Sequence, residues 1–156
     1  MNRLENIRQT VDHLLRQQPD EVERRCGFVH LYGVSAICAL LAVRRGLDVE
    51  LCATAGMLHD ISAYETGDST DHARRGASRA RELLAEAGGF SSSEISSIAG
   101  AILTHSIKNQ IDDPMAELLK DADVLQHYLY NPSLKGGWRT NPRLNAMFAE
   151  LGLPGS

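Results

Sequence analysis

The sequence predicts an all-α protein with a single domain, and two observations support this class. Almost every segment repeats its apolar residues with the period of a helix, and no stretch alternates convincingly like a strand. The 156 residues are enough for one domain with a sizeable core, and the connections between periodic segments are short. We therefore expect one bundle of about six to seven helices across 1–156, with a core at 20–130 and a C-terminal extension at 131–156.

The first three helices follow from an apolar stripe and from helix-end signals. Residues 2–17 place their leucine, isoleucine and valine side chains on one face. A second helix, at 21–45, ends where two arginines precede Gly46, because basic residues and glycine both favour a helix C-terminus. Asp48 is a good N-cap for a third helix, which we expect to run to about residue 62.

The later helices begin at recognisable capping sequences. A fourth helix, at 71–87, stops at a pair of glycines, and the Ser-Ser-Ser-Glu that opens 91–106 has the form of a capping box. Asp-Asp-Pro opens a sixth helix at 112–130, because proline suits the first turn. A loop containing Trp138, which could stack on a base or cap the core, leads to a short last helix at 141–151.

Charge and cysteine content narrow the possible functions. The formal net charge is -4, and no basic stripe carries interleaved aromatic residues, so we expect no polynucleotide partner. Three cysteines without a CxxC spacing indicate reduced thiols in a cytoplasmic protein. The N-terminus shows no apolar signal segment, and no apolar run approaches the ~18 residues of a membrane span. We therefore expect a cytoplasmic protein without a membrane partner.

The doublet His59–Asp60 places two polar side chains near the end of an apolar helical segment. Such a pair costs free energy inside a core unless other groups satisfy it. A metal ion, a salt bridge and a surface position at a helix end would each do so, and the doublet alone does not separate these possibilities.

The helical period places four histidines on inward faces of different helices: His30, His59, His72 and His105. A single inward histidine is more often a hydrogen-bonded core residue than a metal ligand. Four of them would each need a polar partner in the core, whereas one shared metal site satisfies all of them together. We expect His13 to be solvated and His127 to lie near the inner face of the sixth helix, where it could support the site.

A site of imidazoles needs a further acid to balance a divalent charge, and the sixth helix offers Asp121 and Asp123. The helical period does not separate the two. Imidazole and carboxylate ligands without a thiolate suit Fe, Mn, Co, Ni or Zn better than Mg.

His30, the doublet His59–Asp60 and a late aspartate together resemble the ligand pattern of the HD-domain metal-dependent phosphohydrolase superfamily. The resemblance covers about 20–130 and implies that the bundle is a single HD domain. It selects Asp123, because this family places the ligand after a small residue and just before an apolar turn, as in Ala-Asp-Val-Leu.

Two further motifs resemble the dinuclear branches of this superfamily. Asp-His-Ala-Arg-Arg-Gly-Ala, around His72, is similar to a histidine-x3-Gly-Ala motif, and Ala-Ile-Leu-Thr-His is similar to the next histidine at a helix end. The resemblance implies two divalent ions bridged by Asp60. It divides the other ligands into two groups, which are His30, His59 and Asp123 for the first ion and His72 and His105 for the second. Such branches include bacterial symmetrical dinucleoside-tetraphosphate hydrolases and mixed-valent diiron oxygenases.

The resemblance implies hydrolysis of a phosphate ester or anhydride in a nucleotide-like small molecule by a metal-activated hydroxide. Asp60 and His59 would then be the catalytic residues. Candidates for binding the substrate phosphate are Arg25 or its neighbour Arg24, Arg75 and Lys108. Each of these also fits a solvated surface charge. Two alternatives stay open, which are a diiron oxygenase with the same ligands and a non-enzymatic metal-binding regulatory module.

Overall fold

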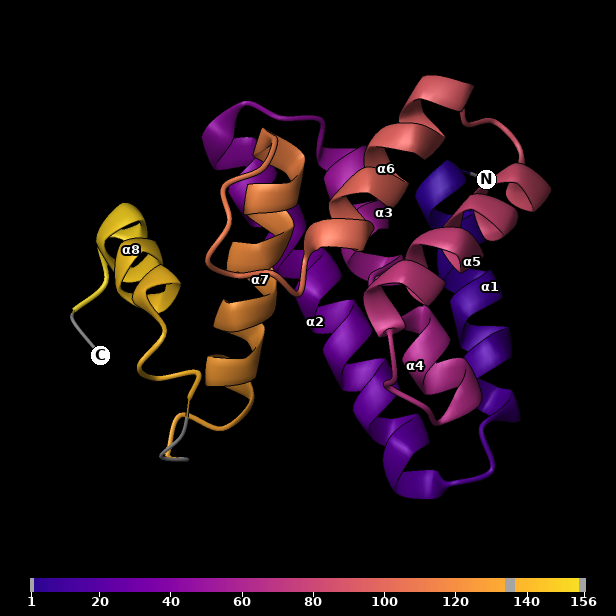
Figure 1. Cartoon of the computed structure of the whole chain (residues 1–156), viewed down its shortest axis with the longest axis horizontal. Coiled ribbons are helices and arrows are strands. Elements are labelled where there is room, and N and C mark those ends of the chain that lie inside the picture. The colour runs from indigo at the N-terminus through magenta and orange to yellow at the C-terminus, as the bar shows by residue number, and fades with distance from the viewer. Residues whose placement is uncertain (1, 134–136, 155–156) are drawn as a thin grey trace.

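The described part of the chain consists of helices joined by short connections. The computed structural model describes residues 2–133 and 137–154, and these residues form eight helices and no strand (Figure 1). The helices are α1 (Arg3–Gln17), α2 (Glu21–Arg45), α3 (Val49–Leu58), α4 (Ile61–Thr66), α5 (His72–Ala87), α6 (Ser92–Thr104), α7 (Pro114–Tyr130) and α8 (Pro142–Leu151). The all-α prediction is confirmed. The loop expected before the last helix lies partly outside the described residues.

The long helix α2 organises the bundle, because α3 and α7 both pack against it (Figure 1). Helices α5 and α6 form a second packed pair, and α6 also contacts α3 and α7. Fully buried leucine and isoleucine side chains from these helices and from α1 form one core, which includes Ile7, Leu31, Leu58, Leu84 and Ile102. The packing brings the middle of α2 and the middle of α7 close to the C-terminal ends of α3 and α6.

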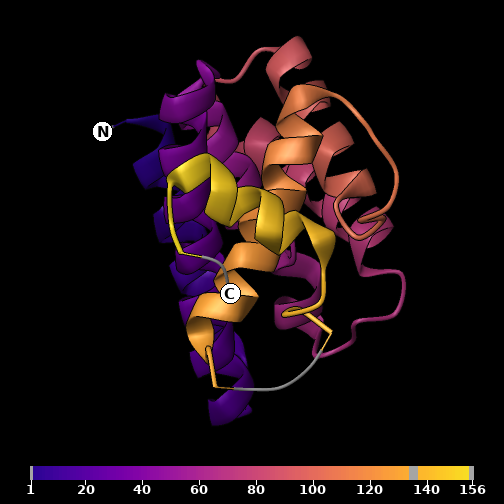
Figure 2. The same ribbon diagram turned by 90° about the vertical axis from the view of Figure 1, so that its left-hand side faces the viewer.

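The C-terminal extension adds one helix to the outside of the bundle. Helix α8 lies across α7 (Figure 2), and Leu144 and Phe148 form a small apolar cluster with Val124 and Leu125. This packing holds the extension beside the helix that carries Asp123.

The third expected helix differs from the structure at the His59–Asp60 doublet. We expected one helix through residue 62, but α3 ends at Leu58 and the short α4 begins at Ile61. Asp60 has φ of -114° and ψ of 12°, which lies outside the helical range and interrupts the helix. This interruption accounts for the eighth helix and turns the doublet into a corner between two helices.

The expectation that no apolar run approaches the length of a membrane span was wrong. Within α2, an 18-residue window is long and apolar enough, by length and composition, to cross a membrane. This is weak evidence for a membrane segment, because the core helix of a globular domain passes the same test. In this bundle 44% of that window is buried, including Leu31, Val34 and Leu41.

Candidate metal centre

Five elements converge on one point inside the bundle. Helix α2 contributes His30, the corner between α3 and α4 contributes His59 and Asp60, and α7 contributes Asp123. His72 is the first residue of α5, and His105 follows the last residue of α6. The structure therefore brings together all six residues that the sequence nominated as metal ligands.

The four histidines in this centre have the same orientation. Each ring uses Nδ1 to reach an oxygen atom on the side away from the centre. The acceptors are the side-chain Oε1 of Gln126 for His30 at 2.6 Å, and the backbone oxygens of Gly56 for His59 at 2.8 Å, Ser69 for His72 at 3.1 Å and Ile102 for His105 at 2.7 Å. Because Nδ1–H donates in each case, the lone pair of Nε2 is left for the centre. Metal-binding histidines are oriented in this way.

His30, His59 and Asp123 form the first group of potential ligands. The Nε2 atoms of the two histidines lie 3.0 Å apart, and Oδ1 of Asp123 lies 3.4 Å from the His30 nitrogen. Two nitrogen lone pairs repel at this distance unless a cation or a proton lies between them. Nitrogen ligands at about 2.0–2.1 Å from one ion would stand about 3 Å from each other, so this spacing fits a shared ion.

Asp60 faces both this group and a second one. Its Oδ2 lies 3.5 Å from Nε2 of His30 and 3.4 Å from Nε2 of His59. Its Oδ1 lies 3.2 Å from Nε2 of His105 and 3.6 Å from Nε2 of His72. The two oxygens of one carboxylate therefore point at two separate pairs of imidazoles.

Two carboxylate oxygens of the centre have no hydrogen-bond partner. Oδ1 of Asp60 and Oδ1 of Asp123 are buried and unsatisfied in the described structure. An unsatisfied buried acceptor costs about 1–3 kcal/mol, and more when it is charged. Asp123 Oδ1 faces the first group and Asp60 Oδ1 the second, so a cation in each group would satisfy the oxygen that faces it, and the residues present fit metal ions.

The electrostatic field of the centre also favours a positive charge. Burial lowers the pKa of His59, but the carboxylates of Asp60 and Asp123 outweigh burial and raise this pKa to about 10. Burial acts to raise the pKa of Asp60, yet the neighbouring imidazoles, His59 first among them, hold that pKa well below its usual range. The two carboxylates thus make the centre favourable for a positive charge.

The structure separates the two aspartates that the helical period left open. Asp123 faces the centre, whereas Asp121 accepts hydrogen bonds from Nη2 of Arg45 at 2.7 Å and from Nη1 of Arg143 at 2.9 Å. These ion pairs tie α7 to the C-terminal end of α2 and to α8. Asp121 is therefore engaged away from the histidines.

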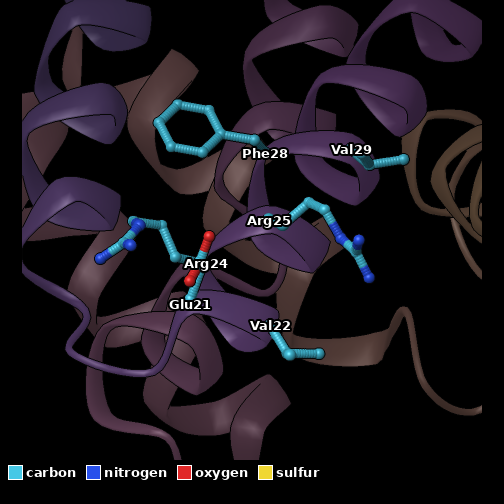
Figure 3. A pocket seen from close by; sticks show the side chains of 6 residues that line it. All are labelled: Glu21, Val22, Arg24, Arg25, Phe28 and Val29. Atoms are coloured by element: carbon cyan, nitrogen blue, oxygen red, sulfur yellow. The ribbon is translucent and has the colours of Figure 1, made fainter.

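Arg24 and Arg25 lie outside the centre. The two side chains leave α2 in opposite directions (Figure 3), and Nη1 of Arg24 donates to the backbone oxygen of Gln18 at 2.8 Å. Arg25 is exposed on an outer hollow of about 460 Å³ that it shares with Val22 and Val29. No member of the six-residue centre lines this hollow.

Arg75 and Lys108 are both engaged by protein atoms. Arg75 donates to Asp68 Oδ2, in the loop before α5, at 2.8 Å and to Thr66 Oγ1, at the end of α4, at 2.9 Å. Lys108 does reach the centre, but its Nζ donates to Asp123 Oδ2 at 2.5 Å and to the backbone oxygen of His105. Lys108 therefore orients a carboxylate of the centre in this structure.

Two side chains beside the centre contact its potential ligands. Gln126 was not selected, yet it orients His30, and a Cβ on Gly33 would come within 2.9 Å of its Cγ. His127 has its Nε2 3.3 Å from Asp123 Oδ1, and its ring stacks on Trp138 with centroids 4.0 Å apart. Both residues follow Asp123 by one helical turn, and that spacing is the signal that could have found Gln126. His127 was expected near the inner face of this helix.

Two cavities open from the centre. We call the first the polar cavity, which has about 290 Å³ and is lined by Glu23, Asp60, Tyr64, Gly67, Ser69 and His72. We call the second the tyrosine cavity, which has about 160 Å³ and is lined by Val29, His30, Tyr64, Gln126, His127 and Tyr130. Tyr64 lines both cavities.

The fold and the site together define an α-helical domain whose His/Asp clusters can hold divalent metal ions. A family model described as the HD domain matches residues 27–128, and the chain belongs to this family. The crystal structure of a predicted HD superfamily hydrolase from an uncultured Thermotogales bacterium is similar in fold. Its TM-score is 0.61 at 20% sequence identity, over 92% of this chain and 90% of that one. No curated protein matches the chain.

Proposed function

We propose that this protein is a metal-dependent hydrolase of phosphate esters or anhydrides that acts on a nucleotide-like small molecule. The observation that carries the proposal is the carboxylate of Asp60, whose two oxygens face two separate groups of imidazoles. Membership of the HD domain family is consistent with it. The similar Thermotogales protein is itself described as a predicted hydrolase.

The proposed site holds two divalent ions, chosen from Fe, Mn, Co, Ni and Zn by the nitrogen and oxygen ligands. Asp60 would be shared between the ions. The remaining ligands are His30, His59 and Asp123 for the first ion and His72 and His105 for the second.

Bound divalent ions would polarise a phosphoryl oxygen and lower the pKa of water from 15.7 to about 7. Hydrolysis adds one water across a P–O bond and releases the alcohol and the phosphate. Asp60 and His59 lie where these groups would meet, and the Nδ1–H bond of His59 to Gly56 holds its ring in place. Lys108 keeps Asp123 Oδ1 turned toward the centre by occupying Oδ2.

The first experiment measures metal content by elemental analysis of protein purified without chelators or added metal. We expect about two ions per chain in the native protein and about one in His72→Ala. His13→Ala is the matched control, because His13 is exposed on α1 and should retain the native content. At most one ion in the native protein, unchanged by His72→Ala, would leave a mononuclear site and remove the role proposed for His72.

The second experiment tests the reaction class with the metal-loaded protein. A panel of nucleotides and simple phosphate esters is assayed for released phosphate, with oxygen uptake recorded in parallel. We expect phosphate release without oxygen consumption. Oxygen uptake with an organic substrate, and no phosphate release, would contradict the hydrolase and identify an oxygenase.

A further inference from the structure

The tyrosine cavity lies directly against the proposed first metal group. His30 contributes to that group and also lines the cavity. Tyr64 also lines the polar cavity, whose other walls include Asp60 and His72. A substrate with its phosphate at the first metal group can therefore extend one substituent past His30 into the tyrosine cavity.

The walls of the tyrosine cavity suit a flat ring. Tyr64, Tyr130 and His127 supply three ring systems, and Val29 and Cys26 supply apolar surface between them. The His127 ring is held by stacking on Trp138, with only 5° between the two planes. Because aromatic rings stack favourably on one another, these walls favour an aromatic substituent over an aliphatic or charged one.

One polar group in this cavity could form a hydrogen bond with the edge of such a ring. Gln126 uses its Oε1 to accept from Nδ1 of His30, so the group that its side chain still offers is the amide NH2. An NH2 donor complements a carbonyl oxygen or ring nitrogen, which are the acceptors that nucleobases carry.

The charges around the two cavities limit the number of phosphate groups that the substrate can carry. No lysine or arginine is among the described residues that line either cavity, and the polar cavity includes the acidic Glu23. The nearby cations Arg75 and Lys108 are bound to Asp68 and Asp123. The metal ions would therefore be the main positive charges available, and a long polyphosphate chain would extend beyond them without a partner.

From these observations we infer that the tyrosine cavity binds the aromatic base of a substrate that carries a single phosphate, such as a nucleoside monophosphate. This inference rests on the proposed function for the position of the phosphate. It assigns base recognition to Val29, Tyr130 and the His127–Trp138 stack.

The test fills the cavity with a bulky side chain and uses a matched control on the same helix. Val29→Trp places an indole at the position that the tyrosine cavity shares with the outer hollow, whereas Val22→Trp places one on the outer hollow alone. Tyr130→Ala, at a side chain that is 56% exposed, removes a wall with little cost to folding. Metal content is measured for every variant, so that a lost metal is not mistaken for a lost base site.

Two measurements distinguish binding of the base in the tyrosine cavity from hydrolysis of the phosphate. The first is binding of adenosine to the metal-loaded protein by titration calorimetry, which requires no turnover. The second is hydrolysis of adenosine monophosphate compared with glycerol phosphate, which lacks a ring, and with adenosine triphosphate, which carries a longer phosphate chain.

We expect Val29→Trp to weaken adenosine binding and to raise KM for adenosine monophosphate by about tenfold or more, with glycerol phosphate unaffected. Tyr130→Ala should act in the same direction, and Val22→Trp should match the native protein. We also expect kcat/KM for the monophosphate to exceed that for the triphosphate.

Equal adenosine binding by Val29→Trp and the native protein would overturn the base site, and faster hydrolysis of the triphosphate would overturn the single-phosphate assignment. If no phosphate is released but Val29→Trp still abolishes adenosine binding, the proposed function fails while the base site stands.

Discussion

Nε2 of His30 and Nε2 of His59 lie 3.0 Å apart, although 29 positions separate the two residues in the chain. Each ring donates from Nδ1 to an oxygen on its outer side, so two lone pairs meet at the centre of the bundle. Unless a cation or a proton lies between them, these lone pairs repel and raise the free energy of the folded state. A bound cation reverses that cost, and metal binding should therefore be coupled to stability.

Removing the metal should lower the stability of the protein. A ligand that binds only the folded state, at about 100 times its Kd, adds about 2.7 kcal/mol to the free energy of unfolding. We expect Mn²⁺ or Zn²⁺ to raise the Tm of the chelator-treated protein. His30→Ala should reduce the increase, because of the two proposed groups only that of Asp60, His72 and His105 stays complete, while His13→Ala keeps the full increase. Equal Tm values with and without metal would contradict a metal site in the folded state.

Gln126→Leu should weaken metal binding without removing a ligand. The variant takes away the acceptor that orients His30, and loss of such a partner typically lowers metal affinity by about 10–100-fold. Competition with a chelator of known affinity measures the change. Gln17→Leu, at an exposed position of α1, is the control and should retain the native affinity.

Asp121→Asn and Asp123→Asn should affect different properties of the protein, which are its stability and its metal affinity. Asp123→Asn removes a charge from the centre and should reduce metal affinity. Asp121→Asn should leave metal content unchanged but cost about 1–3 kcal/mol of stability, because it weakens the ion pairs to Arg45 and Arg143. Chemical denaturation and elemental analysis on the same samples check both outcomes. Metal loss in Asp121→Asn would indicate that the assignment of the two aspartates is reversed.

Gly76→Ala should disturb the corner that carries the doublet. A Cβ at this position would lie 2.8 Å from the backbone oxygen of His59, so α5 would have to move away from the centre. We expect a loss of about 1–3 kcal/mol in the free energy of unfolding, together with weaker metal binding. Gly100→Ala is the contrasting variant, because no atom lies within 4 Å of its new Cβ. It should stabilise α6 by about 0.5–1 kcal/mol.

Lys120→Met should change the dependence of stability on pH. Lys120 is fully buried, and its Nζ donates to Asp112 Oδ2 at 2.5 Å and to Glu117 Oε1 at 3.0 Å. The hydrogen bond from Lys120 lowers the pKa of Asp112 below its usual 3.8. Burial acts to raise the pKa of Glu117, but hydrogen bonds from the Asp112 N–H and from Lys120 lower it below 4.5.

A carboxylate whose pKa is lowered on folding contributes stability above its unfolded pKa and loses it as the pH falls through the folded pKa. Lys120→Met should therefore be less stable than the native protein at pH 7, and the difference should shrink below about pH 4. Denaturant titrations at several pH values measure this. A difference that stays constant down to pH 2 would assign the effect of Lys120 to packing alone.

The sequence by itself determined the helical class and most of the helix boundaries. These features depend on local signals, which are the apolar period and the caps at Asp20, Asp48, Ser91 and Asp113. The same period identified the inward histidines, because it reports which face of a helix is buried. The choice of Asp123 over Asp121 came from the family resemblance.

Only the tertiary structure decided how these faces meet. The helix break at Asp60 depends on a corner that the local sequence pattern does not signal. The engagement of Lys108 by Asp123, and of Gln126 by His30, depends on contacts between residues far apart in the chain. A sequence period specifies the direction of a side chain on its own helix. The distance between side chains on different helices is set by packing, and the chemistry of the centre depends on that distance.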